Sequence, residues 1–252
     1  MAATMPDDRL KTWFRAGRSV GCHWLGLGAP VLAELAADAG AETIVFDIQH
    51  GRWSSAGVQD AVAMVAGRAP CLARVADASY FSIGWALDAG VHGVIVPMIS
   101  TPEQAADVVT SSRFPPLGRR SGGGARPMAN FGDYRRATAE DLVVAVMIET
   151  VEGLEACEAI AATPGLDMIF IGPSDLSLAL GTRQGSEVFE AALARILTAG
   201  RAAGVTVGVY TGAAQAAARA KQGFQLVVAA DDISANRAIP AAAWKAFKEA
   251  VG

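Results

Sequence analysis

The sequence predicts an α/β protein, a single (β/α)8 barrel that spans residues 1–252 as one domain. Three observations favour this fold. Short apolar segments without polar alternation recur along the chain, as in parallel strands that are covered on both faces. Longer Ala-rich segments of helical character separate them. Eight such units in 252 residues favour a closed barrel over an open doubly wound sheet.

The elements alternate from one end of the chain to the other. The expected strands lie near Val20–Trp24, Thr43–Ile48, Cys71–Val75, Gly93–Pro97, Leu142–Ile148, Asp167–Ile171, Val205–Tyr210 and Gln225–Ala229. The expected helices are Pro30–Ala39, Gly57–Val65, Tyr80–Ala89, Thr101–Ser111, Glu152–Ala161, Val188–Ala203 and Ala213–Gln222, with a last amphipathic helix at Pro240–Val251. Many of these helices end at a glycine, as helices commonly do.

One connection, Arg113–Arg136, has little helical or strand periodicity. A loop of this length inside a compact domain is usually functional or disordered. Because we expect it to leave the fourth predicted strand at the carboxyl-terminal face of the barrel, we predict that it covers an active site there. Its Gly122–Gly124 triplet is a weaker candidate for a phosphate cradle, since no Gly-Lys-Ser/Thr sequence follows it.

Composition limits the classes of function. A formal net charge of −4 offers no basic face for a phosphate backbone, so nucleic acid is not an expected partner. No apolar stretch reaches the length of a membrane span, and residues 1–18 carry charges where a signal peptide would have an apolar core, so we expect a soluble, cytoplasmic protein. With 52% hydrophobic residues, some apolar surface is expected to be buried between subunits. Cys22, Cys71 and Cys157 have no metal-type spacing and are predicted to be buried thiols.

Two carboxylates follow predicted strands. Glu149 ends the run Leu142–Ile148, and Asp175 comes shortly after Asp167–Ile171. The carboxyl ends of barrel strands converge on one mouth, where two carboxylates can hold one hard divalent cation. The alternatives are a helix N-cap for Asp175 and an ordinary strand-end charge for Glu149.

Two further strand ends carry polar side chains, His50 after the second strand and Arg74 at the end of the third. His50 is a candidate for proton transfer or a hydrogen-bonded, half-buried histidine. Arg74 is a candidate anion clamp or a salt-bridge partner. Tyr210 closes the seventh predicted strand, where it either borders the mouth or packs in the core.

Six segments resemble the HpcH/HpaI aldolases: Phe46–Gly51, Ala73–Val75, Val94–Met98, Phe114–Ser121, Met147–Thr150 and Phe170–Ser177. The resemblance covers nearly the whole chain. It implies a TIM barrel of the phosphoenolpyruvate/pyruvate type, assembled as a homo-hexamer in which C-terminal helices are exchanged between neighbours. It also implies a class II aldolase that cleaves and forms 4-hydroxy-2-oxoacids, with pyruvate or hydroxypyruvate as donor and an aldehyde as acceptor.

The resemblance assigns roles to the strand-end residues. Glu149 and Asp175 match the carboxylates that hold Mg²⁺, Mn²⁺ or Co²⁺. Arg74 matches an arginine at the keto oxygen, where enolate charge develops. His50 matches the acid/base residue, and Asp88 matches the carboxylate that orients it.

Further matches surround these residues. Asp47 corresponds to an acid that contacts water on the metal, and Trp24 to a residue that shapes the aldehyde pocket. The backbone at Gly172, Pro173 and Ser174 is expected to receive the substrate carboxylate. The chain departs from several relatives at Met147, where they have glutamine, and at Gln49. Both departures leave the metal ligands in place.

The lysines test the mechanism independently. Lys11, Lys221, Lys245 and Lys248 are the only lysines, and none lies on a predicted strand, so a Schiff-base mechanism is disfavoured. Two other functions stay open: a CoA-ester lyase of the citrate-lyase β type, and a noncatalytic barrel that senses a 2-oxoacid. A longer chain with more basic residues would favour the lyase, and a sensor would not need His50.

Overall fold

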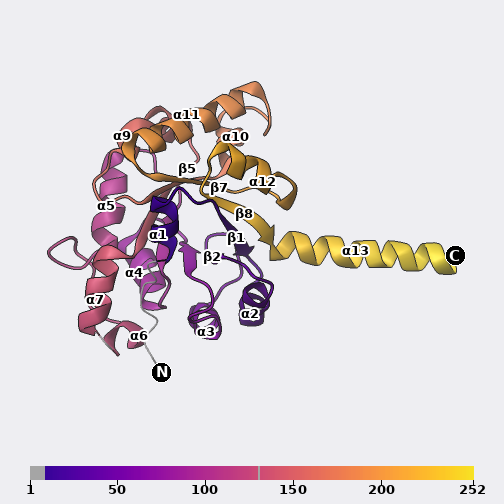
Figure 1. Cartoon of the computed structure of the whole chain (residues 1–252), viewed down its shortest axis with the longest axis horizontal. Coiled ribbons are helices and arrows are strands. Elements are labelled where there is room, and N and C mark those ends of the chain that lie inside the picture. The colour runs from indigo at the N-terminus through magenta and orange to yellow at the C-terminus, as the bar shows by residue number, and fades with distance from the viewer. Residues whose placement is uncertain (1–8, 130) are drawn as a thin grey trace.

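The computed structural model describes residues 9–129 and 131–252, and within them the strands form a closed parallel barrel in chain order (Figure 1). This confirms the predicted (β/α)8 architecture. The strands are β1 (Val20–Leu25), β2 (Thr43–Asp47), β3 (Cys71–Arg74), β4 (Gly93–Val96), β5 (Val143–Ile148), β6 (Met168–Ile171), β7 (Thr206–Val209) and β8 (Leu226–Asp231). Each differs from its predicted range by no more than two residues at either end.

Helices precede, connect and follow the strands, and most of them cover the outside of the barrel. They are α1 (Arg9–Arg15), α2 (Pro30–Asp38), α3 (Ser55–Met64), α4 (Tyr80–Asp88), α5 (Pro102–Ser112), α6 (Ala125–Met128), α7 (Phe131–Glu140), α8 (Val151–Glu155), α9 (Cys157–Ala161), α10 (Pro173–Ala179), α11 (Glu187–Ala203), α12 (Ala213–Gln222) and α13 (Asp232–Val251). Side-chain caps fix the start of several of these helices. Ser79 accepts a hydrogen bond from Ser82 N–H at the start of α4, and Thr101 and Gln104 form a capping box at α5.

Alternation along the strands divides the core in two. Inward residues such as Val45, Leu72 and Phe170 fill the barrel, while outward residues such as Ile44 and Phe46 pack against the helices. Because the pleat has a period of two, Asp47 and Arg74 continue the inward series at the last position of β2 and β3. The register pairs them directly across the two strands. The strand pattern therefore places an acid and a base side by side at the mouth.

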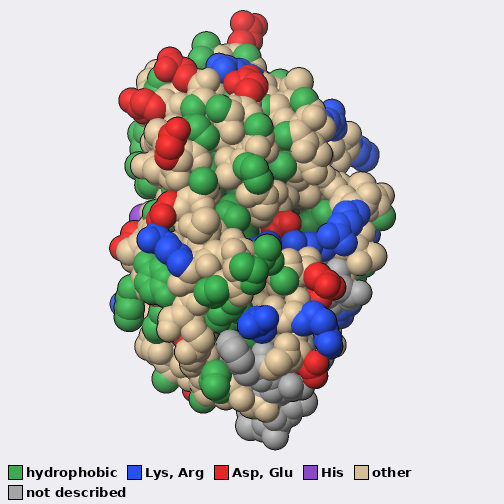
Figure 2. Space-filling model, turned by 90° about the vertical axis from the view of Figure 1, so that its left-hand side faces the viewer, with side chains coloured by type: hydrophobic (Ala, Val, Ile, Leu, Met, Phe, Trp, Pro, Cys, Tyr) green, Lys and Arg blue, Asp and Glu red, His purple; other side chains and the backbone are tan. Residues whose placement is uncertain are grey.

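The segment Arg113–Arg136 does not cover the strand ends, so that prediction was wrong. It follows α5, which has already returned the chain to the opposite end of the barrel. It contains α6 and begins α7, and α7 lies on the side of the barrel away from the start of α13 (Figure 1). Figure 2 shows that face, on which basic and acidic side chains are interspersed among hydrophobic ones.

Helix α13 is longer than predicted, since it starts at Asp232 and continues through Pro240. It projects away from the barrel (Figure 1). Its apolar side chains are exposed: Ile239 by 70%, Trp244 by 62%, Phe247 by 56% and Val251 by 68%. None of the described helices combines the length and apolarity needed to cross a membrane.

Candidate active site

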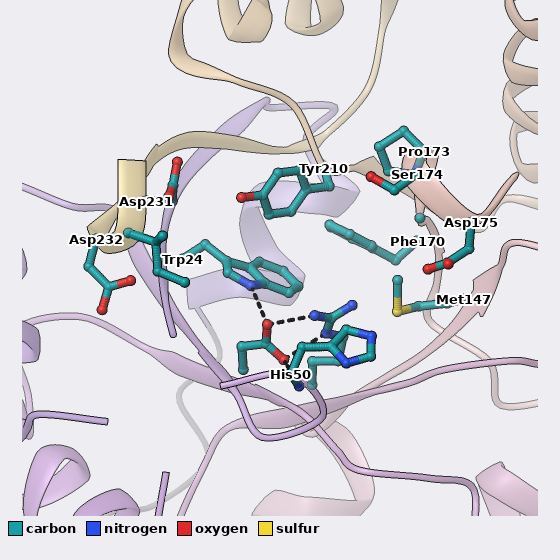
Figure 3. A pocket seen from close by; sticks show the side chains of 14 residues that line it. Trp24, His50, Met147, Phe170, Pro173, Ser174, Asp175, Tyr210, Asp231 and Asp232 are labelled. Atoms are coloured by element: carbon teal, nitrogen blue, oxygen red, sulfur yellow. Dashed lines mark hydrogen bonds and ion pairs between the residues drawn. The ribbon is translucent and has the colours of Figure 1, made fainter. Parts of the chain in front are cut away.

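A cavity of about 230 Å³ opens at the carboxyl ends of the strands (Figure 3). Side chains from the ends of seven strands, or from the residues just after them, line it. They are Trp24, Asp47, His50, Arg74, Met147, Phe170, Gly172, Pro173, Ser174, Asp175, Tyr210, Asp231, Asp232 and Ile233. The structure thus brings most of the predicted site residues together, including Pro173 and Ser174.

Asp47, Arg74 and Trp24 form one hydrogen-bonded group on this cavity. Arg74 donates from Nε to Asp47 Oδ1 at 2.9 Å and from Nη2 to Asp47 Oδ2 at 2.5 Å. Trp24 Nε1 donates to Asp47 Oδ2 at 3.2 Å, and the Arg74 guanidinium lies 5.1 Å from the Trp24 ring centroid. Burial alone would raise the pKa of Asp47, but the charge of Arg74 and the hydrogen bonds from Arg74, His50 N–H and Trp24 together outweigh it and lower the pKa. Asp47 is therefore a buried, ionised anchor for Arg74.

His50 lies in the turn after β2, and its side chain is exposed at the cavity. Its backbone N–H donates to Asp47 Oδ1 at 3.1 Å, so the same carboxylate that holds Arg74 also fixes the His50 turn. Tyr210 follows β7 and packs edge-on against Trp24, with ring centroids 5.3 Å apart. Burial raises the pKa of Tyr210 to about 12, so its hydroxyl stays protonated at neutral pH.

Glu149 is 2% exposed and lies just beyond β5. Its Oε1 accepts a hydrogen bond from Met98 N–H at 2.7 Å, while its Oε2 is buried and has no hydrogen-bond partner in the described part of the chain. A Cβ added at Gly172 would overlap Glu149 Oε2, so only glycine leaves room for this carboxylate. Burial raises the pKa of Glu149, and the negative charge of Asp175 raises it further.

Asp175 lies in the first turn of α10, and Gly172 is the N-cap of that helix. The N-cap interpretation of Asp175 is therefore wrong, and its carboxylate is free to face the cavity beside Met147 (Figure 3). The described residues contain no group of three or more His, Cys, Asp or Glu placed to hold a metal ion. Mg²⁺, however, is commonly held by one or two carboxylates plus water and substrate. An orphaned oxygen on Glu149 and a second carboxylate nearby fit that donor set.

Asp88 is not brought to this cavity within the chain. It ends α4, at the opposite end of the barrel, and accepts a hydrogen bond from Arg120 Nη2 at 2.8 Å. The predicted orientation of His50 by Asp88 is thus not met here, because a helix that follows a barrel strand carries its last residue back to the far end.

The lysines lie away from the cavity, in agreement with the sequence. Lys11 is on α1 and pairs with Asp167 at 2.7 Å, and the other three are on α12 and α13. The cysteines are free and buried, as predicted.

Sequence reasoning missed three residues that follow or end β8 and line the cavity: Asp231, Asp232 and Ile233. Asp232 is 3% exposed and accepts hydrogen bonds from Gly26 N–H at 2.8 Å and Leu27 N–H at 2.9 Å. Asp231 caps α13 through Ser234 N–H at 2.7 Å. The rule that singled out Glu149, an acid at the end of an apolar run, would have found this pair.

A barrel with polar groups gathered at the carboxyl ends of its strands has the architecture of (β/α)8 enzymes. Comparison with known proteins narrows this class. The sequence model of the HpcH/HpaI aldolase/citrate lyase family matches residues 21–236, and the chain belongs to that family.

Individual relatives agree with this assignment. The chain is 36% identical over 212 residues to a 4-hydroxy-2-oxovalerate aldolase of Novosphingobium aromaticivorans, covering 79% of this chain and 80% of the relative. It is 36% identical over 214 residues to a hydroxypyruvate/pyruvate aldolase of Pseudomonas aeruginosa, covering 80% and 79%. A crystal structure of a family member from Burkholderia cenocepacia superposes with a TM-score of 0.87 at 33% identity, covering 98% of this chain and all of the other.

Proposed function

We propose that the protein is a class II aldolase, a carbon–carbon lyase that cleaves and forms 4-hydroxy-2-oxoacids with pyruvate or hydroxypyruvate as donor and an aldehyde as acceptor. The observation that carries this proposal is the buried, unpartnered Oε2 of Glu149. Glu149 does not itself line the cavity, but it lies close enough to Asp175 and Arg74, which do, for both charges to act on its pKa. The names of the relatives support the reaction class.

Glu149 and Asp175 would hold the divalent cation, Mg²⁺, Mn²⁺ or Co²⁺. When bound, the cation supplies Lewis-acid stabilisation of negative charge on the donor's keto oxygen. Glu149 is positioned by the protein itself, since Met98 N–H binds its Oε1 and the absence of a side chain at Gly172 leaves room for its Oε2.

We assign Arg74 to stabilise the same negative charge on the keto oxygen of the donor. Asp47 occupies its Nε and Nη2, which orients the guanidinium without consuming Nη1. A charge donor fixed in this way favours the enolate-like transition state over the neutral ketone, which is what lowers the barrier.

His50 is the proposed residue that moves protons. Its exposed imidazole reaches the cavity from a turn anchored on Asp47. The donor carboxylate is expected at Gly172 and Ser174, whose backbone N–H groups precede or begin α10; Pro173 has no N–H to donate. Trp24 and Tyr210 border the acceptor end.

We also propose that the chain assembles as a homo-hexamer through α13. The exposed apolar side chains of this helix, Trp244 and Phe247 among them, need cover that a single barrel does not give. Removal of residues 240–252 should reduce the oligomer. A full-length chain that is monomeric by light scattering would contradict the proposal.

Chelation tests the reaction. Aldol cleavage of a 4-hydroxy-2-oxoacid should stop when the protein is stripped with a chelator and return with Mg²⁺, Mn²⁺ or Co²⁺. Glu149→Ala and Asp175→Ala should lose cation affinity in calorimetry, while Glu158→Ala, a change of an exposed glutamate, should not. A stable lysine adduct after borohydride treatment with pyruvate would overturn the metal mechanism.

The same assays separate the two alternatives. A CoA-ester lyase should require a CoA thioester and should not join pyruvate to a simple aldehyde. The cavity lining includes one arginine and no lysine, which offers little to the phosphates of CoA. A sensor should bind a 2-oxoacid without turnover.

A further inference from the structure

A second cavity of about 530 Å³ runs between α11 and α12, and no step proposed above uses it. We define it as the α11/α12 groove; its walls include Phe189, Leu193, Ala214 and Gln215. It is larger than the reaction cavity of about 230 Å³. It has three residues in common with that cavity, Pro173, Ser174 and Tyr210, so the two spaces adjoin at one wall.

The shared wall lies on the side of the reaction cavity away from His50 (Figure 3). The proposed donor site consists of Arg74, His50, the carboxylate pair and the backbone N–H groups of Gly172 and Ser174, so of the shared polar residues Tyr210 alone has no part in binding the donor. A molecule that reacts there and is too long for the smaller cavity would reach the groove by extending past the side chain of Tyr210. The groove is placed to receive the distal part of an acceptor.

The groove carries no uncompensated charge. Among the described residues, its charged side chains are Arg219 and Glu190, which bind each other through two contacts of 2.6 and 2.7 Å. The hydrogen bond from Arg219 lowers the pKa of Glu190, so the pair stays ionised and internally neutralised at neutral pH. An anionic tail would find no free cation along this groove.

Its neutral polar groups are available instead. The side-chain amides of Gln184 and Gln215 are exposed and make no hydrogen bond within the described residues. Ser174 and Thr211 add hydroxyl groups to the same walls. Amides and hydroxyls both donate and accept, which suits the hydroxyl groups of a neutral ligand.

The geometry points to a distal acceptor subsite in the α11/α12 groove that takes uncharged, hydroxylated aldehydes longer than two carbons. This inference rests on the proposed aldolase function and adds its acceptor class. It predicts that an aldehyde with several hydroxyl groups is preferred to one of the same length that ends in a carboxylate.

Acceptor profiles test the class. With pyruvate as donor, kcat/KM is measured for glycolaldehyde, for D-erythrose, and for succinic semialdehyde, which has the length of erythrose but carries a charge. The wild-type protein should use D-erythrose better than succinic semialdehyde. The reverse order would overturn the inference.

A matched pair of variants tests the place. Ala214 and Ala217 are both exposed on α12, but only Ala214 lines the groove. Ala214→Phe should lower the kcat/KM ratio of D-erythrose to glycolaldehyde about tenfold, the effect of losing one or two neutral hydrogen bonds, and Ala217→Phe should leave the ratio unchanged. Gln215→Ala, which changes no packing in the core, should lower the ratio in the same direction.

Different results would overturn the proposed aldolase activity and the proposed acceptor subsite. If the wild-type protein joins pyruvate to no aldehyde, the proposed function is wrong. If it uses glycolaldehyde but the ratio is equal in wild type, Ala214→Phe and Gln215→Ala, the groove is not the acceptor subsite.

Discussion

The two sides of the reaction cavity each have a buried carboxylate, and the two carboxylates differ in their hydrogen bonding. On the β2–β3 side, Asp47 is buried and each of its oxygens accepts at least one hydrogen bond, from Arg74, Trp24 or His50 N–H. On the β5–β6 side, Glu149 is equally buried but only Oε1 has a partner. We call the β2–β3 side complete, because both oxygens of Asp47 have hydrogen-bond partners, and the β5–β6 side incomplete, because Oε2 of Glu149 has none among the described residues.

This difference separates a positioning group from a binding group. Buried polar atoms in folded proteins nearly always find partners, so an exception calls for one that the chain itself does not supply. Asp47 uses its hydrogen bonds for orientation, whereas Glu149 keeps a lone pair for a ligand. The two pKa changes go in opposite directions, as this difference in hydrogen bonding leads one to expect: the pKa of Asp47 is lowered and that of Glu149 is raised.

The largest expected effect comes from breaking the complete side. Arg74→Ala should slow deuterium exchange into the pyruvate methyl group by about 10²–10³-fold, because a fixed charge donor to the developing enolate is lost. The variant also strands Asp47 as a buried charge, so a lower melting temperature is expected too. Exchange is followed by proton NMR on metal-loaded protein.

Arg195→Ala is the matched control, since Arg195 forms an exposed pair with Glu158 on the outside of the barrel. Its exchange rate should equal that of the wild type. Undiminished exchange in a folded Arg74→Ala protein would remove Arg74 from the enolisation step.

The next effect concerns the space that the incomplete side needs. Gly172→Ala would push a methyl group onto Glu149 Oε2, so cation affinity should fall by about 10–100-fold. Gly84→Ala, in α4, is a suitable control because an added Cβ there meets nothing within 4 Å. Calorimetric titration with Mn²⁺ measures both. Equal affinities in the two variants would show that Glu149 is not a ligand.

The complete side is the easier one to predict from sequence. Continuous apolar runs locate β2, β3 and β5, and the period of two then places Asp47 and Arg74 inside the mouth. Glu149 continues the inward series of β5 by the same rule, whereas Asp175 lies on α10 and follows only from the convergence of strand ends at the mouth. The sequence does not reveal that Oε2 of Glu149 lacks a partner, because that depends on Met98 and Gly172 from two other strand ends.

Tertiary contacts explain the other errors. Helix α7 has a polar, Arg-rich sequence with weak periodicity, yet Tyr134 anchors it by donating to Leu87 O at 3.2 Å and is 1% exposed. The sequence pattern misses the first turns of α13 because Pro240 resembles a helix start, although a proline within a helix is tolerated at a cost. Residues 113–136 do not line the mouth because α5 leads the chain away from it before they begin.

A smaller effect is expected at Met98, the only non-glycine residue with positive φ in the described chain, at 60°. Its side chain is 53% exposed, so packing does not explain the strain, but its N–H reaches Glu149. Met98→Val should weaken Mn²⁺ binding about tenfold, because a β-branched residue resists this conformation. Met98→Gly should keep wild-type affinity. Equal Mn²⁺ affinity in Met98→Val and Met98→Gly would show that the backbone conformation at residue 98 does not position Glu149 for the cation.

The smallest expected effect concerns stability as a function of pH in metal-free protein, where the contributions of Asp47 and Glu149 should change in opposite directions. The pKa of Asp47 is lowered from 3.8, so its ionised form contributes stability above pH 3.8 that is lost as pH falls through the folded-state pKa. The pKa of Glu149 is raised from 4.5, so its contribution is fully present below pH 4.5 and is lost as pH rises through the folded-state value. The two carboxylates therefore stabilise the fold over opposite ranges of pH.

Two isosteric variants test this prediction, with the free energy of unfolding measured in urea at several pH values. Asp47→Asn should cost more free energy of unfolding at pH 7 than at pH 3, because only the ionised carboxylate holds Arg74. Glu149→Gln should gain relative to wild type as pH rises from 4.5 toward 7, because it removes a buried charge that has no partner on Oε2. Added Mn²⁺ should reverse the order for Glu149→Gln by stabilising the wild type alone. If both variants change in the same direction with pH, the two carboxylates do not differ in the way their hydrogen bonds imply.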